Sequence, residues 1–242
     1  MFTPADYAPE HYRSRATADL VMPMVLAFTG ARSVLDIGCG VGAWLAVCAE
    51  QGITDYLGID GGPAGEVLQI PRQHFRAADL REPLQLDRRY DVAISLETAE
   101  HLPAEVGPTL IAELTAAAPY VLFSAAIPGQ RGNGHINERW PSYWAGLFAA
   151  HGYSPLDMIR PALWGREGIP YWYQQNILLY AHHDRVPENS RAPTMVDVVH
   201  PALLTRYVER LYEAEHRHIS GKTAMRALAT SVTNRLRRLI RR

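Results

Sequence analysis

The chain has little cysteine, no long apolar run and almost no net charge. Its 242 residues include two cysteines, Cys39 and Cys48, which are too few for a zinc cluster or a disulfide framework and fit a reducing compartment. No apolar stretch reaches the roughly 18 to 20 residues of a membrane-spanning helix, and the first residues lack the pattern of a signal peptide. The net charge of −1 argues against nucleic acid as a partner. We therefore expect a cytoplasmic protein.

Hydrophobic periodicity predicts an α/β fold. Residues 1–30 have apolar side chains at helical spacing and are expected to form a helical lead-in that acts as a lid. Short apolar runs then alternate with helix-like stretches over residues 31–182, as in a doubly wound, Rossmann-like sheet with right-handed crossovers. Strands are predicted at residues 33–37, 56–59, 74–77, 91–96, 120–125, 153–159 and 172–180. A further helix is predicted at 141–150, where proline stands in the first turn.

Residues 183–242 are expected to form a linker followed by amphipathic helices. The last helix, from Lys222 to Arg242, carries many basic side chains, and no acidic residue occurs from Gly221 onward. A basic amphipathic helix can lie on an anionic membrane surface, bind a polyanion or pack between the subunits of a homodimer. The alternative is a solvated helix that packs or frays, as chain ends often do.

A glycine-rich turn between the first predicted strand and the next helix is the strongest local signal. Gly38, Gly40 and Gly42 allow a tight turn and the close approach of a ligand to the backbone. Asp60 ends the next predicted strand, where a carboxylate can accept hydrogen bonds from both hydroxyls of a ribose. The turn and the carboxylate together predict a nucleotide-type binding site.

The spacing of this turn differs from that of dinucleotide-binding proteins. It is Gly-x-Gly-x-Gly instead of Gly-x-Gly-x-x-Gly, and Asp36 stands two residues before the first glycine. A carboxylate there would repel a pyrophosphate, but it can help to hold the amino-acid end of a zwitterionic ligand. The cofactor is therefore expected to lack phosphate groups.

These residues resemble the first motif and the ribose-binding acid of class I S-adenosylmethionine-dependent methyltransferases. The resemblance covers about residues 31–182 and includes the segment 90–102 around the fourth strand. It implies a seven-stranded sheet with one antiparallel strand at 172–180, S-adenosylmethionine as cofactor and S-adenosylhomocysteine as product. The cofactor contacts expected beside Asp36, Gly38, Gly40, Gly42 and Asp60 are Cys39, Gly61, Asp79, Leu80, Leu96 and Glu97. Asp79 has the alternative of capping a turn.

The acceptor side of the site is expected in the segment after the fifth strand. His135 is the first candidate for a general base, because histidine is well suited to removing the proton of a hydroxyl acceptor. The aromatic and polar residues around it suit a sugar or oligosaccharide acceptor, and the strings 134–137 and 140–144 look like those of methyltransferases in bacterial polysaccharide and glycoconjugate clusters. The expected substrate contacts are Tyr12, Asn137, Trp140, Tyr143, Trp144 and Trp172. The alternative is that the aromatics are core residues and His135 an ordinary loop histidine.

Glu97 and His101 are further catalytic candidates, although the pair Glu100 and His101 has the alternative of local capping and packing. No metal site is assigned, but Glu97 and Glu100 leave metal dependence open. The absence of an Asn-Pro-Pro-Tyr or Asp-Pro-Pro-Tyr string disfavours nucleobase amines as acceptors. Three hypotheses remain: a sugar O-methyltransferase, or a methyltransferase for another small molecule; a nicotinamide-dependent oxidoreductase; and a non-catalytic cofactor-binding module.

Overall fold

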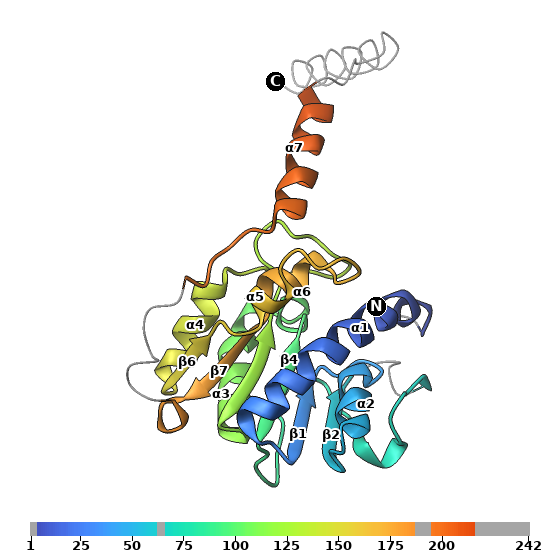
Figure 1. The fold of residues 1–242 in the computed structure, drawn as a ribbon, viewed down its shortest axis with the longest axis vertical. Helices are drawn as coiled ribbons and strands as arrows, with labels where there is room; N and C mark the ends of the chain where they lie inside the picture. The colour runs from blue at the N-terminus through green and yellow to red at the C-terminus, as the bar shows by residue number, and fades with distance from the viewer. Residues whose placement is uncertain (1–3, 62–65, 187–194, 216–242) are drawn as a thin grey trace, which may run out of the picture. The chain divides into compact units, whose positions relative to one another are not determined.

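A seven-stranded sheet forms the centre of the structure, in the order β3-β2-β1-β4-β5-β7-β6 (Figure 1). The computed structural model describes residues 4–61, 66–186 and 195–215, with side chains described from Ser14 onward. The strands are β1 (Ser33–Ile37), β2 (Asp55–Asp60), β3 (Phe75–Ala77), β4 (Val92–Leu96), β5 (Tyr120–Ser124), β6 (Tyr153–Leu156) and β7 (Leu178–His182). Neighbouring strands from β3 to β5 pair in parallel, and β7 runs antiparallel to β5 and β6. The predicted seven-stranded, Rossmann-like sheet with one antiparallel strand is confirmed.

Helices cover both faces of the sheet. The helices are α1 (Pro4–Thr29), α2 (Ala43–Glu50), α3 (Gly107–Ala117), α4 (Pro141–Ala150), α5 (Arg160–Leu163), α6 (Tyr171–Asn176) and α7 (Pro201–Glu215). One core layer contains side chains of α1, α2, α5 and α6, and the other contains side chains of α3 and α4. In β4, Val92 and Ile94 belong to the first layer and Ala93 to the second, because successive strand residues point to opposite faces. Burial on both faces explains the uninterrupted apolar runs of the parallel strands.

The last predicted strand was placed too early in the chain. Residues 172–177 do not form a strand, because α6 occupies Tyr171–Asn176 and β7 begins at Leu178. The helix follows Pro170, and its buried Gln174 donates hydrogen bonds from its side-chain amide to the Arg166 and Ile169 carbonyls. These tertiary contacts outweigh the strand propensity of the aromatic residues. The predicted strand at 153–159 is likewise shorter, since β6 ends at Leu156.

Part of the expected linker packs on the sheet domain. The buried Arg160 pairs with Asp157 and donates hydrogen bonds to the carbonyls of Met195 and Val196, both at 2.7 Å. The chain divides into two units, residues 1–200 and 201–242. The first unit therefore extends beyond residue 182, the end expected from the sequence.

The second unit is described only through α7. Its side chains Leu204, Val208 and Leu211 are more than half exposed. The basic segment from Lys222 to Arg242 lies outside the described residues, and so does any contact it makes with a membrane, a polyanion or a second subunit. Among the helices of the described ranges, none combines the length and apolar character needed to span a membrane.

Candidate active site

The glycine-rich turn lies at the carboxyl end of β1 and leads into α2. The backbone N–H groups of Gly38 and Cys39 donate to the Ile59 carbonyl, which fastens the turn to β2. Gly38 has φ +84°, and a Cβ atom built on it would lie 2.2 Å from Oγ1 and 2.8 Å from Cβ of Thr98. Gly42, the last residue before α2, has φ +86°. Both the backbone conformation and the lack of space require glycine at Gly38.

Asp60 lies at the end of β2, beside this turn. Its Oδ2 atom accepts a hydrogen bond of 2.7 Å from the Gly40 N–H. Burial raises the pKa of Asp60 to about 6, against the opposing effect of hydrogen bonds from the Gly40 and Gly61 backbone. The ends of β1 and β2 thus place a carboxylate and a bare backbone turn side by side, as the sequence predicted.

A cavity of about 250 Å³ opens between this turn and the end of β4. Predicted site residues in its lining are Gly38, Cys39, Gly40, Asp60, Leu80, Leu96, Glu97 and His101. Leu80 and His101 also line an adjoining hollow of about 660 Å³, together with Gly61 and Asp79. The cavity lies outside the carboxyl ends of the strands where the strand order reverses, which is the usual ligand position in open α/β sheets.

Two of the predicted cofactor residues have surroundings that the sequence did not reveal. Asp36 is 2% exposed and is not part of the cavity lining. Burial, followed by the charge of Asp60, raises the pKa of Asp36 well above its usual value. Asp79 is exposed and pairs with Arg81, whose hydrogen bonds lower the pKa of Asp79 to about 2. Asp79 therefore acts as a turn cap in this structure.

Glu97 stands directly after β4 in a strained backbone conformation, with φ +50°. Its Oε1 atom accepts from the Asn176 amide at 3.1 Å and its Oε2 atom from the Gln130 amide at 2.9 Å. Asn176 also donates to the Gln130 side-chain oxygen at 2.9 Å. Burial raises the pKa of Glu97, and hydrogen bonds from Asn176, Ser124 and Gln130 oppose the shift. Strained residues held by surrounding contacts are frequent in active sites.

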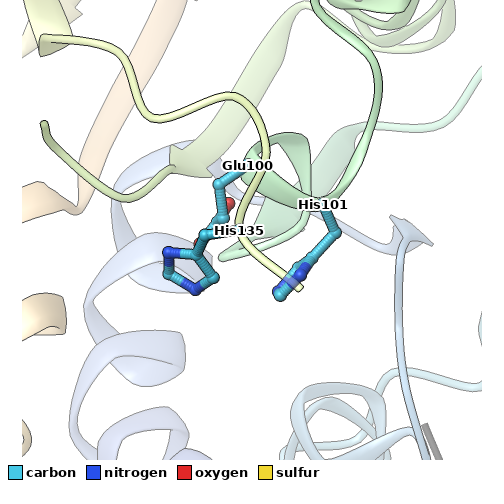
Figure 2. A group of neighbouring side chains, drawn as sticks. All are labelled: Glu100, His101 and His135. Atoms are coloured by element: carbon cyan, nitrogen blue, oxygen red, sulfur yellow. The ribbon is translucent and has the colours of Figure 1, made fainter. Parts of the chain in front are cut away.

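Glu100, His101 and His135 form a cluster after β4 and β5 (Figure 2). The rings of His101 and His135 meet edge to face, with centroids 4.9 Å apart. His135 places Nδ1 3.0 Å from Oε1 of Glu138. Burial, followed by the charge of His135, lowers the pKa of His101 to about 4. Burial and the charge of Glu97 raise the pKa of Glu100 well above its usual value.

The two histidines differ in their access to the cavity. His101 belongs to the cavity lining, whereas His135 is not part of it and lies against the His101 ring. The sequence singled out His135 as the first candidate for a base. The structure brings His101, and not His135, to the wall of the cavity.

The predicted substrate residues are only partly brought to this region. Asn137 is buried, donates to the Ala99 carbonyl and accepts from Arg139, so its amide is occupied by the loop itself. Trp140 is 40% exposed and Tyr143 half-buried at the start of α4. Trp172 is half-buried against the first core layer. For Tyr12, the helix position is described but the side chain lies outside the described residues.

Trp144 corrects an expectation, since it is 1% exposed and packs against Phe123 in the second core layer. Its place on the inward face of α4 leaves it no access to an acceptor. Trp144→Ala is expected to lower the free energy of unfolding by about 3 to 5 kcal/mol through the cavity that it creates. Trp140→Ala, the exposed control four residues earlier, should change it by less than about 0.5 kcal/mol. Denaturant unfolding of both variants checks this, and a small effect of Trp144→Ala would contradict the core assignment.

Several cavity residues were missed by sequence reasoning. Ser14 of α1 and Tyr173 of α6 meet across the cavity, with their hydroxyl oxygens 3.1 Å apart, and Trp44 packs edge-on against Tyr173. Tyr173 lies directly after Trp172, which the sequence placed among the expected substrate contacts. Ser14 and Trp44 carry no such signal, because helix packing alone brings them to the site.

Known proteins that resemble the chain include methyltransferases. The family model described as a methyltransferase domain matches residues 10–158. An uncharacterized methyltransferase of Mycobacterium sp. (strain KMS) is 33% identical over 90 residues, which are 36% of this chain and 35% of that protein. The chain thus matches about a third of the length of such relatives.

Solved structures share the fold. CalS10, an amino pentose methyltransferase from Micromonospora echinaspora, superimposes with a TM-score of 0.56 at 16% identity, over 75% of this chain and 98% of that one. The sugar N-methyltransferase KedS8 from Streptoalloteichus sp. gives a TM-score of 0.55 at 16% identity, over 75% of this chain and 93% of its own.

Proposed function

Because this chain belongs to the methyltransferase-domain family, we propose that it transfers the methyl group of S-adenosylmethionine to a hydroxyl group of a sugar or saccharide. The observation that carries the proposal is the cavity bounded by Gly38, Gly40 and Asp60 on one side and by Glu97 and His101 on the other. The first group is suited to holding an adenosine and the second to handling the proton of an acceptor.

S-adenosylmethionine is the cofactor, and the turn and Asp60 supply its binding chemistry. Asp60 would accept hydrogen bonds from the ribose hydroxyls, because an ionised carboxylate offers two oxygens that only accept. The bare backbone of the turn allows the amino-acid end and the sulfonium to lie close to the chain. Leu80, in the wall shared with the adjoining hollow, offers an apolar contact for the adenine.

The affinity for S-adenosylhomocysteine is expected to fall at acidic pH. Burial raises the pKa of Asp60 to about 6, and only the ionised form accepts from both ribose hydroxyls. Burial, followed by the charge of Asp60, also raises the pKa of the neighbouring Asp36. The dissociation constant measured by calorimetry should rise roughly tenfold for each pH unit below about 6. Asp60→Asn should bind weakly with little change between pH 5 and 7; a pH dependence equal to the wild type would contradict the assignment.

The acceptor half of the site provides a proton acceptor and a protected environment. Methyl transfer is an in-line displacement that depends on alignment of donor and acceptor and on exclusion of water. His101 faces the cavity and is backed by His135, which Glu138 orients. We assign removal of the acceptor proton to this pair, with Glu97 as a positioning carboxylate held by its two amide partners.

A sugar acceptor is favoured by the residues between β5 and α4. The segment of residues 128–139 carries polar side chains, and Trp140 and Tyr143 follow it with accessible aromatic surface. Such a mixture offers hydrogen bonds to hydroxyls and apolar contact to a sugar face. Two fold neighbours are themselves described as methylating amino pentose or sugar substrates, and this supports the same acceptor class.

Labelling with S-adenosylmethionine carrying a radioactive methyl group tests the proposal. The full chain is incubated with this donor and with fractionated saccharides, nucleotide sugars, proteins and RNA, and the labelled product is identified by mass spectrometry. A methyl ether on a saccharide is the expected product. A labelled amine, protein or RNA would overturn the acceptor, and S-adenosylhomocysteine binding without any labelled product would favour a non-catalytic module. Absence of S-adenosylhomocysteine binding would overturn the whole proposal.

A further inference from the structure

Glu100 is a fully buried carboxyl group that faces a second carboxyl group. Its side chain is 0% exposed, and neither Oε1 nor Oε2 has a donor that meets full hydrogen-bonding geometry within the described ranges. The groups that approach it are the Glu97 carboxyl group and the backbone N–H groups of Glu100 and Ala126. The backbone carbonyl of Glu100, in contrast, accepts from the N–H groups of Ile136 and Asn137 at 2.8 and 3.1 Å. Buried polar atoms almost always have partners, and two buried carboxyl groups in contact require a shared proton or a nearby cation to offset their repulsion.

Two imidazoles flank this carboxyl group. Glu100, His101 and His135 each offer one ligand atom, and these atoms all lie within 4.8 Å of one another. Figure 2 shows the three side chains gathered between the segment after β4 and the loop after β5. A cation at about 2.1 Å from each donor sets neighbouring donors about 3 to 3.5 Å apart, so the ligand atoms would move closer together when the cation binds.

Glu138 orients the imidazole of His135 and determines which of its nitrogens carries the proton. A carboxylate only accepts hydrogen bonds, so its contact with Nδ1 of His135 places the imidazole proton on Nδ1 and leaves the lone pair on Nε2. The same carboxylate accepts from the backbone N–H groups of Gly129 and Arg131, both at 2.6 Å. A carboxylate that fixes the tautomer and orientation of a histidine is the usual second partner of a metal-bound imidazole.

We propose that Glu100, His101 and His135 bind a divalent cation at the acceptor side of the cavity. Two imidazoles and one carboxylate leave coordination positions open, and this donor set favours Mn²⁺, Co²⁺ or Zn²⁺ over Mg²⁺, which prefers oxygen ligands alone. His101 lines the cavity, so an open position would face a bound acceptor.

The role of the cation rests on the proposed function. Coordinated to the metal, the acceptor hydroxyl has a lowered pKa and loses its proton to water. Its oxygen then forms a bond to the methyl carbon while the carbon–sulfur bond breaks, and the positively charged sulfonium becomes the neutral thioether of S-adenosylhomocysteine. In this form of the reaction His101 and His135 hold the metal instead of taking the proton themselves.

Direct titration with Co²⁺ tests the site without reference to activity. The full chain, without a polyhistidine tag and stripped with EDTA, is titrated with CoCl2 and followed by visible absorption. We expect saturation at one ion per chain. Glu100→Gln and His135→Ala should each raise the dissociation constant at least about tenfold, and Glu138→Gln should do so by about 10- to 100-fold. A double His182→Ala/His183→Ala variant, which removes an adjacent histidine pair elsewhere on the domain, should leave it unchanged.

Binding of S-adenosylhomocysteine to the same samples separates the two proposals. Glu100 and His135 do not line the cofactor cavity, so their variants should keep the wild-type affinity, which also shows that they are folded. Wild-type protein that binds S-adenosylhomocysteine but no Co²⁺ would overturn the metal site and leave the methyltransferase intact. Loss of Co²⁺ binding in the His182→Ala/His183→Ala variant alone would also overturn the metal site and leave the methyltransferase intact. Loss of S-adenosylhomocysteine binding by the wild type would instead overturn the proposed function.

Discussion

Gly38→Ala is expected to weaken binding of S-adenosylhomocysteine by at least about 100-fold, because shifts on the order of 1 Å in a site have effects of this size. The added Cβ atom would lie 2.2 to 2.8 Å from three atoms of Thr98, one of which is Thr98 Cβ. Rotation of the threonine side chain cannot move its own Cβ, so the turn itself must shift. The left-handed φ of +84° adds about 1 to 2 kcal/mol of strain for any residue with a side chain. Calorimetric titration measures the loss.

Gly52→Ala is the matched control for this variant. Gly52 has φ +92°, yet a Cβ built on it meets nothing within 4 Å. It therefore reproduces the backbone strain of the Gly38 variant without the collision. Its affinity for S-adenosylhomocysteine should stay within about twofold of the wild type while its stability falls by about 1 kcal/mol. Circular dichroism confirms folding of both variants, and wild-type affinity in folded Gly38→Ala would remove the turn from the binding site.

Loss of the His101 side chain is expected to slow methyl transfer by about 100- to 10,000-fold, the usual effect of losing a group that handles the proton. His101 is the histidine that lines the cavity, and it acts on the acceptor either as a base or as a metal ligand. His135→Ala should slow methyl transfer by a similar factor, because it removes the ring that packs against His101. The rate with the labelled acceptor measures both effects, and calorimetry should show S-adenosylhomocysteine affinities within about fivefold of the wild type.

The double variant sharpens the test. Residues that act as one unit show strongly non-additive losses, so His101→Ala/His135→Ala should be no slower than the slower single variant. His151→Ala removes an exposed histidine at the end of α4 and should retain full activity. If the loss of rate in the double variant equals the product of the two single losses, the two histidines act independently. Near-normal rates in His101→Ala would exclude His101 from the reaction.

The glycine-rich turn and Asp60, the proposed cofactor half of the site, could be predicted from the sequence because local rules determine them. Glycines at Gly38 and Gly42 are required by their own φ angles, and Asp60 follows from the end of a predicted strand. The strands themselves were predicted because burial on both faces leaves an apolar run that needs no tertiary information. The match at β1 and α4 extends to their boundaries.

The acceptor half depends on tertiary contacts that the sequence does not display. Trp144 and Trp140 differ by one helical turn, and only the packing of α4 decides that the first is core and the second exposed. Asn176 reaches Glu97 across 79 positions of the chain, a pairing for which no periodicity exists. The gathering of His135 beside His101 has the same origin, since a loop without regular structure carries it there.

The carboxylate of Glu138 holds the segment after β5 in its conformation through contacts within that segment, which is useful for protein engineering. It closes residues 129–138 into a ring through Gly129, Arg131 and His135, and Asn176 anchors the ring at Gln130. Residues between these fastening points contribute no strand pairing. Gly132 and Gly134 within this ring are constrained, because a Cβ on Gly132 would lie 2.1 Å from Nε2 of His135 and Gly134 has φ +75°. Residue 133 between them can be exchanged to screen for new acceptors while the sheet beneath keeps its register.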